Sequence, residues 1–299
     1  MYKIIAHIRL TRPANIVTAI ADILAGFSIA GAILHVFPAD GDTTLHSLLW
    51  LCLSTIGLYG GGVAFNDVFD AELDKVERPE RPIPSGAATV KSAAWMASLL
   101  LLMGILAAFM VGILAGGIAI SIAVLAVLYD AWGKHQLIFG PINMGLCRAG
   151  NLLLGMSILP QVPIQKWYLG LIPLLYVAAI TMISRGEVHG KNQKALKGGF
   201  FIYLLLILSI FGLAWRSEVN WWETFPFLLL WGYFIFPPLW KAMKFKEPSL
   251  IGKAVKAAVL SLIILNATLA SAYVGWEVGL VILLLLPLSL QLAKMFAVT

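Results

Sequence analysis

Long apolar stretches, separated by short polar segments, follow one another along the whole chain. Each stretch is close to the length of about 20 residues with which a helix crosses a ~30 Å hydrocarbon layer. They lie at residues 14–37, 45–66, 92–111, 113–129, 137–160, 166–184, 199–215, 223–240, 254–274 and 277–297. This pattern predicts an all-α fold, a single polytopic transmembrane bundle over residues 1–299. It has ten helices, or nine if the last two stretches form one complete and one partial span.

Composition excludes an ordinary soluble domain. Hydrophobic residues make up 60% of the 299 positions and charged residues only 12%, whereas soluble domains carry about 25% charge. A soluble fold of this length has no interior large enough for so much apolar surface.

The distribution of Lys and Arg predicts the orientation. If the N-terminus is cytoplasmic, almost all basic residues fall on that side, and only Lys166 and Arg216 on the other. Cytoplasmic loops of membrane proteins carry such an excess of Lys and Arg. We therefore expect a multi-pass protein of the cell (plasma) membrane with cytoplasmic N-terminus and site loops. The net charge of +6 then reflects topology, and no nucleic-acid partner is expected.

Acidic residues cluster where the second apolar stretch ends. Asp67, Asp70 and Asp74 are spaced i, i+3 and i+7, so on a helix they share one face. Neighbouring carboxylates repel one another unless a cation lies between them. Mg²⁺ takes oxygen ligands and is commonly shared between carboxylates and substrate phosphates. The alternative is a solvated acidic helix end, but ionisable groups embedded at a membrane span are functional by default.

A basic, proline-rich segment follows the acids. Three prolines between residues 79 and 84 predict a rigid, extended loop. Arg78 and Arg81 on this loop have the planar guanidinium that binds phosphate oxygens in pairs. We interpret them, with Asn66 before the first aspartate, as diphosphate-binding residues.

The run NDVFDAELDKVERPERPIPSG, residues 66–86, closely resembles the first signature of the UbiA superfamily of intramembrane prenyltransferases. The segment 12–15 (Arg-Pro-Ala-Asn) and the many-helix layout are similar as well. The resemblance implies a bundle around a central cavity in which a prenyl diphosphate binds through Mg²⁺. Its prenyl group would pass to an acceptor such as an aromatic ring, a quinone precursor, haem or a glycerol phosphate. Residues 147–151 and 184–190 look closest to the EboC-like branch.

The second acidic motif of that family is altered here. In the loop 184–192 the only acidic residue is Glu187, and its i+4 neighbour is Lys191. In one interpretation, Lys191 and Arg185 neutralise the diphosphate and Glu187 keeps a partial metal contact. In the other, the two-metal site is broken and transfer is weak or lost.

Further polar residues lie within the apolar stretches. Lys134 is expected near the diphosphate by resemblance. Asp130 is a candidate for acceptor positioning or proton removal, or else pairs with Lys134 at i+4. Arg148 and Asn151 share a helix face and are expected to line the polar end of the cavity, or to bond between helices. Asn15, near the cytoplasmic end of the first stretch, could reach the site.

The predicted function is Mg²⁺-dependent transfer of a farnesyl- or geranylgeranyl-class prenyl group to an unidentified acceptor, with release of diphosphate. Metal ligands are expected to be Asp67, Asp70, Asp74 and Glu187. Asp67, Asp70, Asp130, Glu187 and Lys191 are the candidate catalytic residues. The alternative is a non-catalytic isoprenoid- or lipid-binding or transport protein on a degenerate scaffold.

Overall fold

The computed structural model describes residues 2–36, 42–185, 193–216 and 221–296, and its regular elements are helices. The first half of the chain contains α1 (Tyr2–Leu10), α2 (Pro13–Ile29), the 3₁₀ turn η1 (Ala32–His35), α3 (Asp42–Phe69), α4 (Ala71–Glu77), α5 (Val90–Phe109), α6 (Ile113–Ala131), η2 (Gly133–His135) and α7 (Phe139–Met156).

The second half continues with α8 (Gln161–Gln165), η3 (Trp167–Gly170), α9 (Leu171–Ser184), α10 (Gln193–Arg216), α11 (Trp221–Phe245), α12 (Pro248–Leu260), α13 (Leu262–Val274), α14 (Trp276–Leu283) and α15 (Leu285–Phe296).

The predicted membrane bundle is confirmed. Within the described residues, seven helical segments are long and apolar enough to cross a membrane. The consecutive helices α12–α13 and α14–α15 each form one of these segments, so the last two apolar stretches are two separate crossings by length. Helices α2, α7 and α11 occupy the three predicted stretches that remain. The chain is an integral, multi-pass membrane protein.

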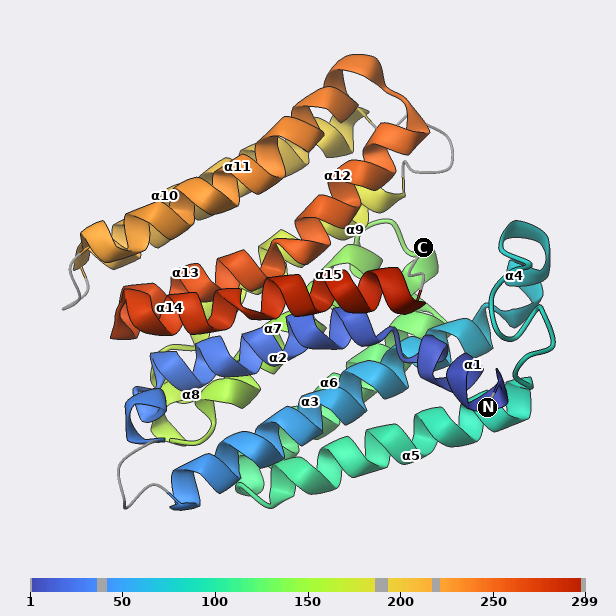
Figure 1. Cartoon of the computed structure of the whole chain (residues 1–299), viewed down its shortest axis with the longest axis horizontal. Coiled ribbons are helices and arrows are strands. Elements are labelled where there is room, and N and C mark those ends of the chain that lie inside the picture. Colours follow the sequence, from blue (N-terminus) through green and yellow to red (C-terminus); the bar gives the residue numbers. More distant parts are fainter. Residues whose placement is uncertain (1, 37–41, 186–192, 217–220, 297–299) are drawn as a thin grey trace.

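The helices lie roughly side by side, with α3, α5 and α6 toward one edge and the α10–α11 pair toward the other (Figure 1). Helices α1 and α4 and the end of α15 lie at the same end of the bundle, which we call the mouth (Figure 1). Helix α13 packs against α2, α11 and α14 and is buried from Leu262 to Ala272. A helix that is apolar all round belongs in such a central position.

Glycines allow the closest helix crossings. A Cβ at Gly26 of α2 would lie 2.3 Å from the carbonyl oxygen of Leu152 in α7, and one at Gly155 of α7 would lie 2.5 Å from that of Ile23 in α2. Helices α3 and α5 approach as closely at Gly57. Small residues at such crossings increase the van der Waals contact between helices, which is a main source of association in lipid.

Candidate functional site

A cavity of ≈ 730 Å³ opens at the mouth and extends into the bundle. Its walls come from helices of both halves of the chain, chiefly α3, α6, α7, α9 and α12. Polar residues line the mouth, among them Arg12, Asn66, Arg78 and Asp130, whereas much of the interior wall is apolar. A cavity with a few convergent polar groups is the usual form of a small-molecule site.

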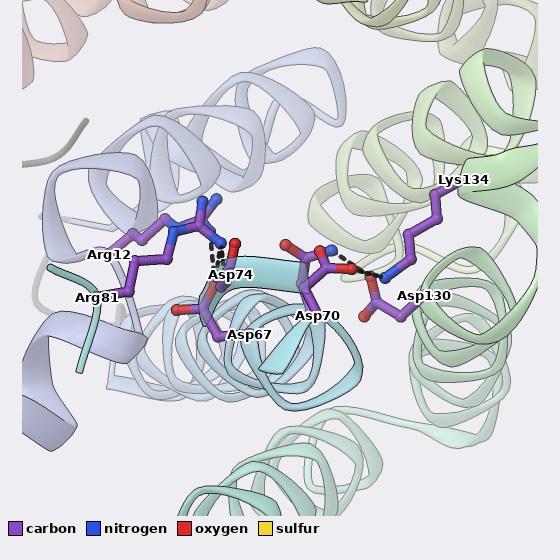
Figure 2. Close-up of polar contacts among 8 residues, drawn as sticks. Arg12, Asp67, Asp70, Asp74, Arg81, Asp130 and Lys134 are labelled. Carbon is purple, nitrogen blue, oxygen red and sulfur yellow. Dashed lines mark hydrogen bonds and ion pairs between the residues drawn. The ribbon is translucent and has the colours of Figure 1, made fainter. Parts of the chain in front are cut away.

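The helix that carries the aspartates breaks at Asp70. Helix α3 ends at Phe69 and α4 begins at Ala71, although Asp70 N–H still donates to Asn66 O at 2.9 Å. The three carboxylates therefore do not share one face as predicted. Asp67 and Asp74 point toward Arg12 and Arg81, and Asp70 points the other way (Figure 2).

Two arginines hold Asp67 and Asp74. Arg12 Nη2 donates to Asp67 Oδ1 at 2.9 Å. Arg81 Nη1 donates to the same oxygen at 3.1 Å and to Asp74 Oδ2 at 2.7 Å. Both aspartates are about 95% buried, and buried charges are stable only when they are paired. Arg81 is thus engaged with the acids, where the sequence predicted a phosphate contact.

Arg12 is a site residue that the sequence marked only as part of the segment 12–15. It has φ +48° in the link between α1 and α2, a left-handed conformation that is uncommon outside glycine. This turn brings its side chain 55 positions along the chain to Asp67. Its position directly before Pro13, at the start of a span, was the only available signal.

A second group lies across the mouth. Lys134 Nζ forms an ion pair with Asp70, and Asn66 Nδ2 donates to Asp130 Oδ1 at 2.9 Å. The end of α3 is thereby connected to the end of α6 and to η2 (Figure 2). The alternative Asp130–Lys134 pair is not among the contacts of the described residues, because Lys134 pairs with Asp70 instead.

The proline-rich segment is a series of turns, not an extended loop. Arg81 N–H donates to Arg78 O at 3.1 Å and Ala88 N–H to Pro82 O at 2.9 Å. Ile83 is buried and packs into a small core cluster with Leu10, which fixes the segment that carries Arg81. Arg78 is exposed and lines the cavity.

Arg185 binds backbone oxygens. At the end of α9 its guanidinium donates to Lys134 O at 3.1 Å, Gln136 O at 2.6 Å and Leu137 O at 3.1 Å. These three oxygens belong to the segment between α6 and α7 that carries Lys134. Glu187 and Lys191 lie outside the described residues, so the second motif stays a prediction.

A second polar network is buried deep in the cavity, away from the mouth. Arg148 Nη1 donates to Asp22 Oδ2 at 2.6 Å, and Asn151 Nδ2 donates to the same oxygen at 3.0 Å. Asn266 Nδ2 donates to Asp22 Oδ1 at 2.6 Å, and Thr55 Oγ1 to Asn151 Oδ1 at 2.8 Å.

Arg148 and Asn151 line the cavity and also bond to residues of neighbouring helices. They therefore have both of the roles that the sequence left open, cavity lining and bonding between helices. They lie deep in the cavity, away from the polar mouth where the sequence analysis expected them. Asn15, by contrast, lines the cavity close to Arg12 at the mouth. Tyr59, whose ring faces the Arg148 guanidinium at 5.3 Å, and Lys256 also line the cavity. No motif in the sequence marked these two.

The acids of the mouth suit a hard cation that is shared with a ligand. Within the described residues no three acidic, His or Cys side chains converge closely enough to hold a metal by themselves. The side-chain bonds of the described residues use Oδ1 of Asp67, Oδ1 of Asp70 and Oδ2 of Asp74. Among these residues the second oxygen of each aspartate has no side-chain partner and suits a metal. Mg²⁺ is usually bound through one or two carboxylates plus substrate phosphates and water, and these residues fit that requirement.

The chain is similar to curated prenyltransferases. It is 30% identical over 194 residues to digeranylgeranylglyceryl phosphate synthase of Ignicoccus hospitalis, covering 63% of this chain and 59% of that protein. It is 35% identical over 176 residues to the same-named protein of Methanoregula boonei, covering 58% and 57%. The match spans less than two thirds of the length of these relatives. The EboC-like branch stays a prediction.

Solved structures show the same fold. A digeranylgeranylglyceryl phosphate synthase in membranes aligns with a TM-score of 0.65 at 19% identity, over 92% of this chain and 99% of that one. A UbiA homologue of Archaeoglobus fulgidus bound to GPP and Mg²⁺ aligns at 0.60 and 14% identity, over 85% and 99%. Residues 24–195, more than half of the chain, match the UbiA prenyltransferase family. The chain therefore belongs to the UbiA prenyltransferase family.

Proposed function

We propose that this chain is an intramembrane, Mg²⁺-dependent prenyltransferase that acts as a single domain over residues 1–299. The observation that carries the proposal is the acidic cluster of Asp67, Asp70 and Asp74, held by side-chain cations at the mouth of a largely apolar cavity. Such a mouth suits the diphosphate of a prenyl donor, and the apolar interior suits its isoprenoid tail.

The acidic cluster is arranged to bind and orient the donor. When bound, Mg²⁺ would supply positive charge that neutralises the diphosphate and favours its departure. The open oxygens of Asp67, Asp70 and Asp74 are the ligands offered to it. Arg12 and Arg81 hold Asp67 and Asp74 in place, because each donates to a carboxylate that is otherwise buried.

Cationic side chains then stabilise the leaving group. The C–O bond of the donor breaks, its electron pair stays on the diphosphate, and an allylic cation remains in the cavity. Lys134 and Arg78 lie where they can share the growing negative charge, and such preorganised electrostatic stabilisation is usually the largest catalytic contribution. The apolar wall keeps water from the cation. The acceptor's nucleophilic atom forms the new bond, and its proton passes to a base, for which Asp130 is the candidate beside Asn66.

The acceptor is proposed to carry a glyceryl phosphate group. The relatives are named for the synthesis of digeranylgeranylglyceryl phosphate. Support within this chain comes from Lys256, an exposed cation that lines the cavity and whose charge is not used by the salt bridges of the described residues. A farnesyl- or geranylgeranyl-class donor is proposed on the same grounds.

The test compares two acids of the same run. Purified protein in nanodiscs is given radiolabelled geranylgeranyl diphosphate, Mg²⁺ and a glyceryl phosphate acceptor, and label transfer and diphosphate release are measured. We expect Asp67→Ala to lower kcat/KM by about 100-fold or more. Glu72→Ala is the matched control, because Glu72 is exposed and, within the part of the chain that the structure describes, forms its ion pair with Lys75.

Equal label transfer by the Asp67→Ala variant and the wild type would contradict the role of the acids. Donor binding without diphosphate release would favour the non-catalytic alternative, for which the altered loop around Glu187 and Lys191 is the motivating feature.

A further inference from the structure

We propose that the buried polar network at the deep end of the cavity forms a floor that limits the length of the prenyl tail to the farnesyl and geranylgeranyl class. This inference rests on the proposed function, since it concerns the tail of the same donor. The floor consists of Thr55 and Asn151, which the network with Asp22 and Asn266 holds in place. Arg148, three residues nearer the mouth on α7, lines the cavity beside the floor and donates to the same Asp22.

The cavity ends at the floor. On α3 its lining residues run from Asn66 at the mouth to Thr55, and on α7 they end at Asn151. The side chains of Thr55 and Asn151 bond to each other at 2.8 Å across this end. From Asn66 to Thr55 is eleven residues of helix, a rise of about 16 Å. Both helices continue beyond this level toward the opposite side of the bundle.

The floor is held rigidly. Asp22 is fully buried and accepts bonds from Arg148, Asn151 and Asn266. Asn151 donates to Ala19 O at 2.9 Å as well. A buried polar network whose members are satisfied is stiff, and displacing one of them leaves a group unpaired at a cost in free energy. An apolar tail offers no replacement bond, so it cannot penetrate the floor without that cost.

Backbone contact closes the space underneath. One turn beyond Asp22 and Asn151, α2 and α7 touch at Gly26 and Gly155, where even a methyl group would collide with the facing backbone. A tail that passed the floor would have to separate these two helices.

The depth of the cavity corresponds to a short isoprenoid. An extended chain advances about 1.2 Å per single bond, as the reach of a polypeptide shows. An isoprene unit with four bonds in its main chain therefore spans about 5 Å, and about 16 Å holds three units extended or four with a bend. A longer tail that follows the axis of the bundle must therefore break the floor.

Binding of unreactive donors tests the floor. Geranyl, farnesyl, geranylgeranyl and hexaprenyl thiodiphosphates are titrated with Mg²⁺ onto the protein in nanodiscs. For the wild type we expect hexaprenyl thiodiphosphate to bind about tenfold more weakly than the geranylgeranyl compound, the effect of one unsatisfied polar group. In Thr55→Ala/Asn151→Ala, which removes both partners of the floor bond together, we expect this difference to disappear.

Two further single variants test the floor independently, in case the double variant does not fold. Thr55→Leu raises the floor and is expected to shift the preference toward the farnesyl and geranyl compounds. Val63→Ala removes a similar volume from the cavity wall nearer the mouth and is expected to leave the order of preference as in the wild type. Thermal unfolding of each variant checks that it is folded.

The outcomes separate the two proposals. Equal binding of all tail lengths by the wild type, or the same shift in Val63→Ala as in the floor variants, would overturn the floor and leave prenyl transfer intact. If no thiodiphosphate binds with Mg²⁺, the donor site itself is wrong and both proposals fall.

Discussion

Three cationic side chains pair with the aspartates at the mouth: Arg12, Arg81 and Lys134. Their positive charges explain how Asp67, Asp70 and Asp74 can lie close together, with Asp130 as a fourth carboxylate nearby. Like charges at this spacing are unfavourable unless cations offset them. The three cations come from positions far from one another in the chain. This pairing is the residue-scale basis of the site, because it leaves one oxygen of each paired aspartate outside the ion pairs of the described residues.

Arg185 is proposed to affect the site indirectly, through the position of Lys134. Its bonds to three backbone oxygens between Lys134 and Leu137 make it a positioning residue for Lys134. We expect Arg185→Ala to lower kcat by about tenfold to 100-fold, since misplacement of a catalytic group by about 1 Å has effects of this size. KM for the donor should change little.

Steady-state kinetics of Arg185→Ala and Arg185→Lys distinguish this role from direct phosphate binding. A lysine cannot donate to all three oxygens at once, so Arg185→Lys should remain impaired in kcat. A rise in KM that the lysine variant restores would instead show that Arg185 contacts phosphate.

At the scale of elements, α2 and α7 cross in close backbone contact. Gly26 has backbone atoms of Leu152, Gly155 and Met156 within 2.8 Å of the place where a Cβ would stand. We expect Gly26→Ala to destabilise the protein by about 2 kcal/mol, the usual effect of overpacking, seen as a lower Tm in detergent.

Gly212→Ala is the matched control on α10. A Cβ at Gly212 meets no atom within 4 Å, and alanine is the better helix former. Its Tm should equal or slightly exceed that of the wild type. If Gly26→Ala and Gly212→Ala unfold at the same temperature, the close crossing does not contribute to stability.

At the scale of the whole molecule, the basic residues predict that the mouth faces the cytoplasm. Lys253 and Lys256 lie on α12 near the mouth, whereas Arg216 ends α10 at the opposite side. We expect a cysteine at Lys253→Cys to be protected from an impermeant maleimide in intact cells, and one at Arg216→Cys to be labelled. Both are placed in a background with Cys52 and Cys147 replaced by Ala.

Permeabilised cells provide the control, in which both cysteines should be labelled. Labelling of Lys253→Cys, and not of Arg216→Cys, in intact cells would reverse the proposed orientation. A purely internal location of both proteins, with no labelling before permeabilisation, would contradict the plasma-membrane assignment.

Much of this organisation follows from the sequence alone. The spacing of apolar stretches is set by the thickness of the bilayer, and helices are required there because lipid cannot satisfy backbone polar groups. That is why the ten stretches are readable one after another, whereas the separation of the last two into full spans follows from the lengths of α12–α13 and α14–α15. The acidic run 67–74 is also local, so its position at the end of a span could be predicted from its neighbours.

The partners within the site were decided by the tertiary structure. Whether Asp70 faces Asp67 or Lys134 depends on a helix break at Asp70, and the spacing of residues does not encode that break. Arg12 reaches Asp67 from 55 positions away, and Asn266 reaches Asp22 from 244. Such pairs depend on which helices are neighbours, which only packing of the complete bundle determines. For the same physical reason, the depth of the cavity and its polar floor appear only in three dimensions.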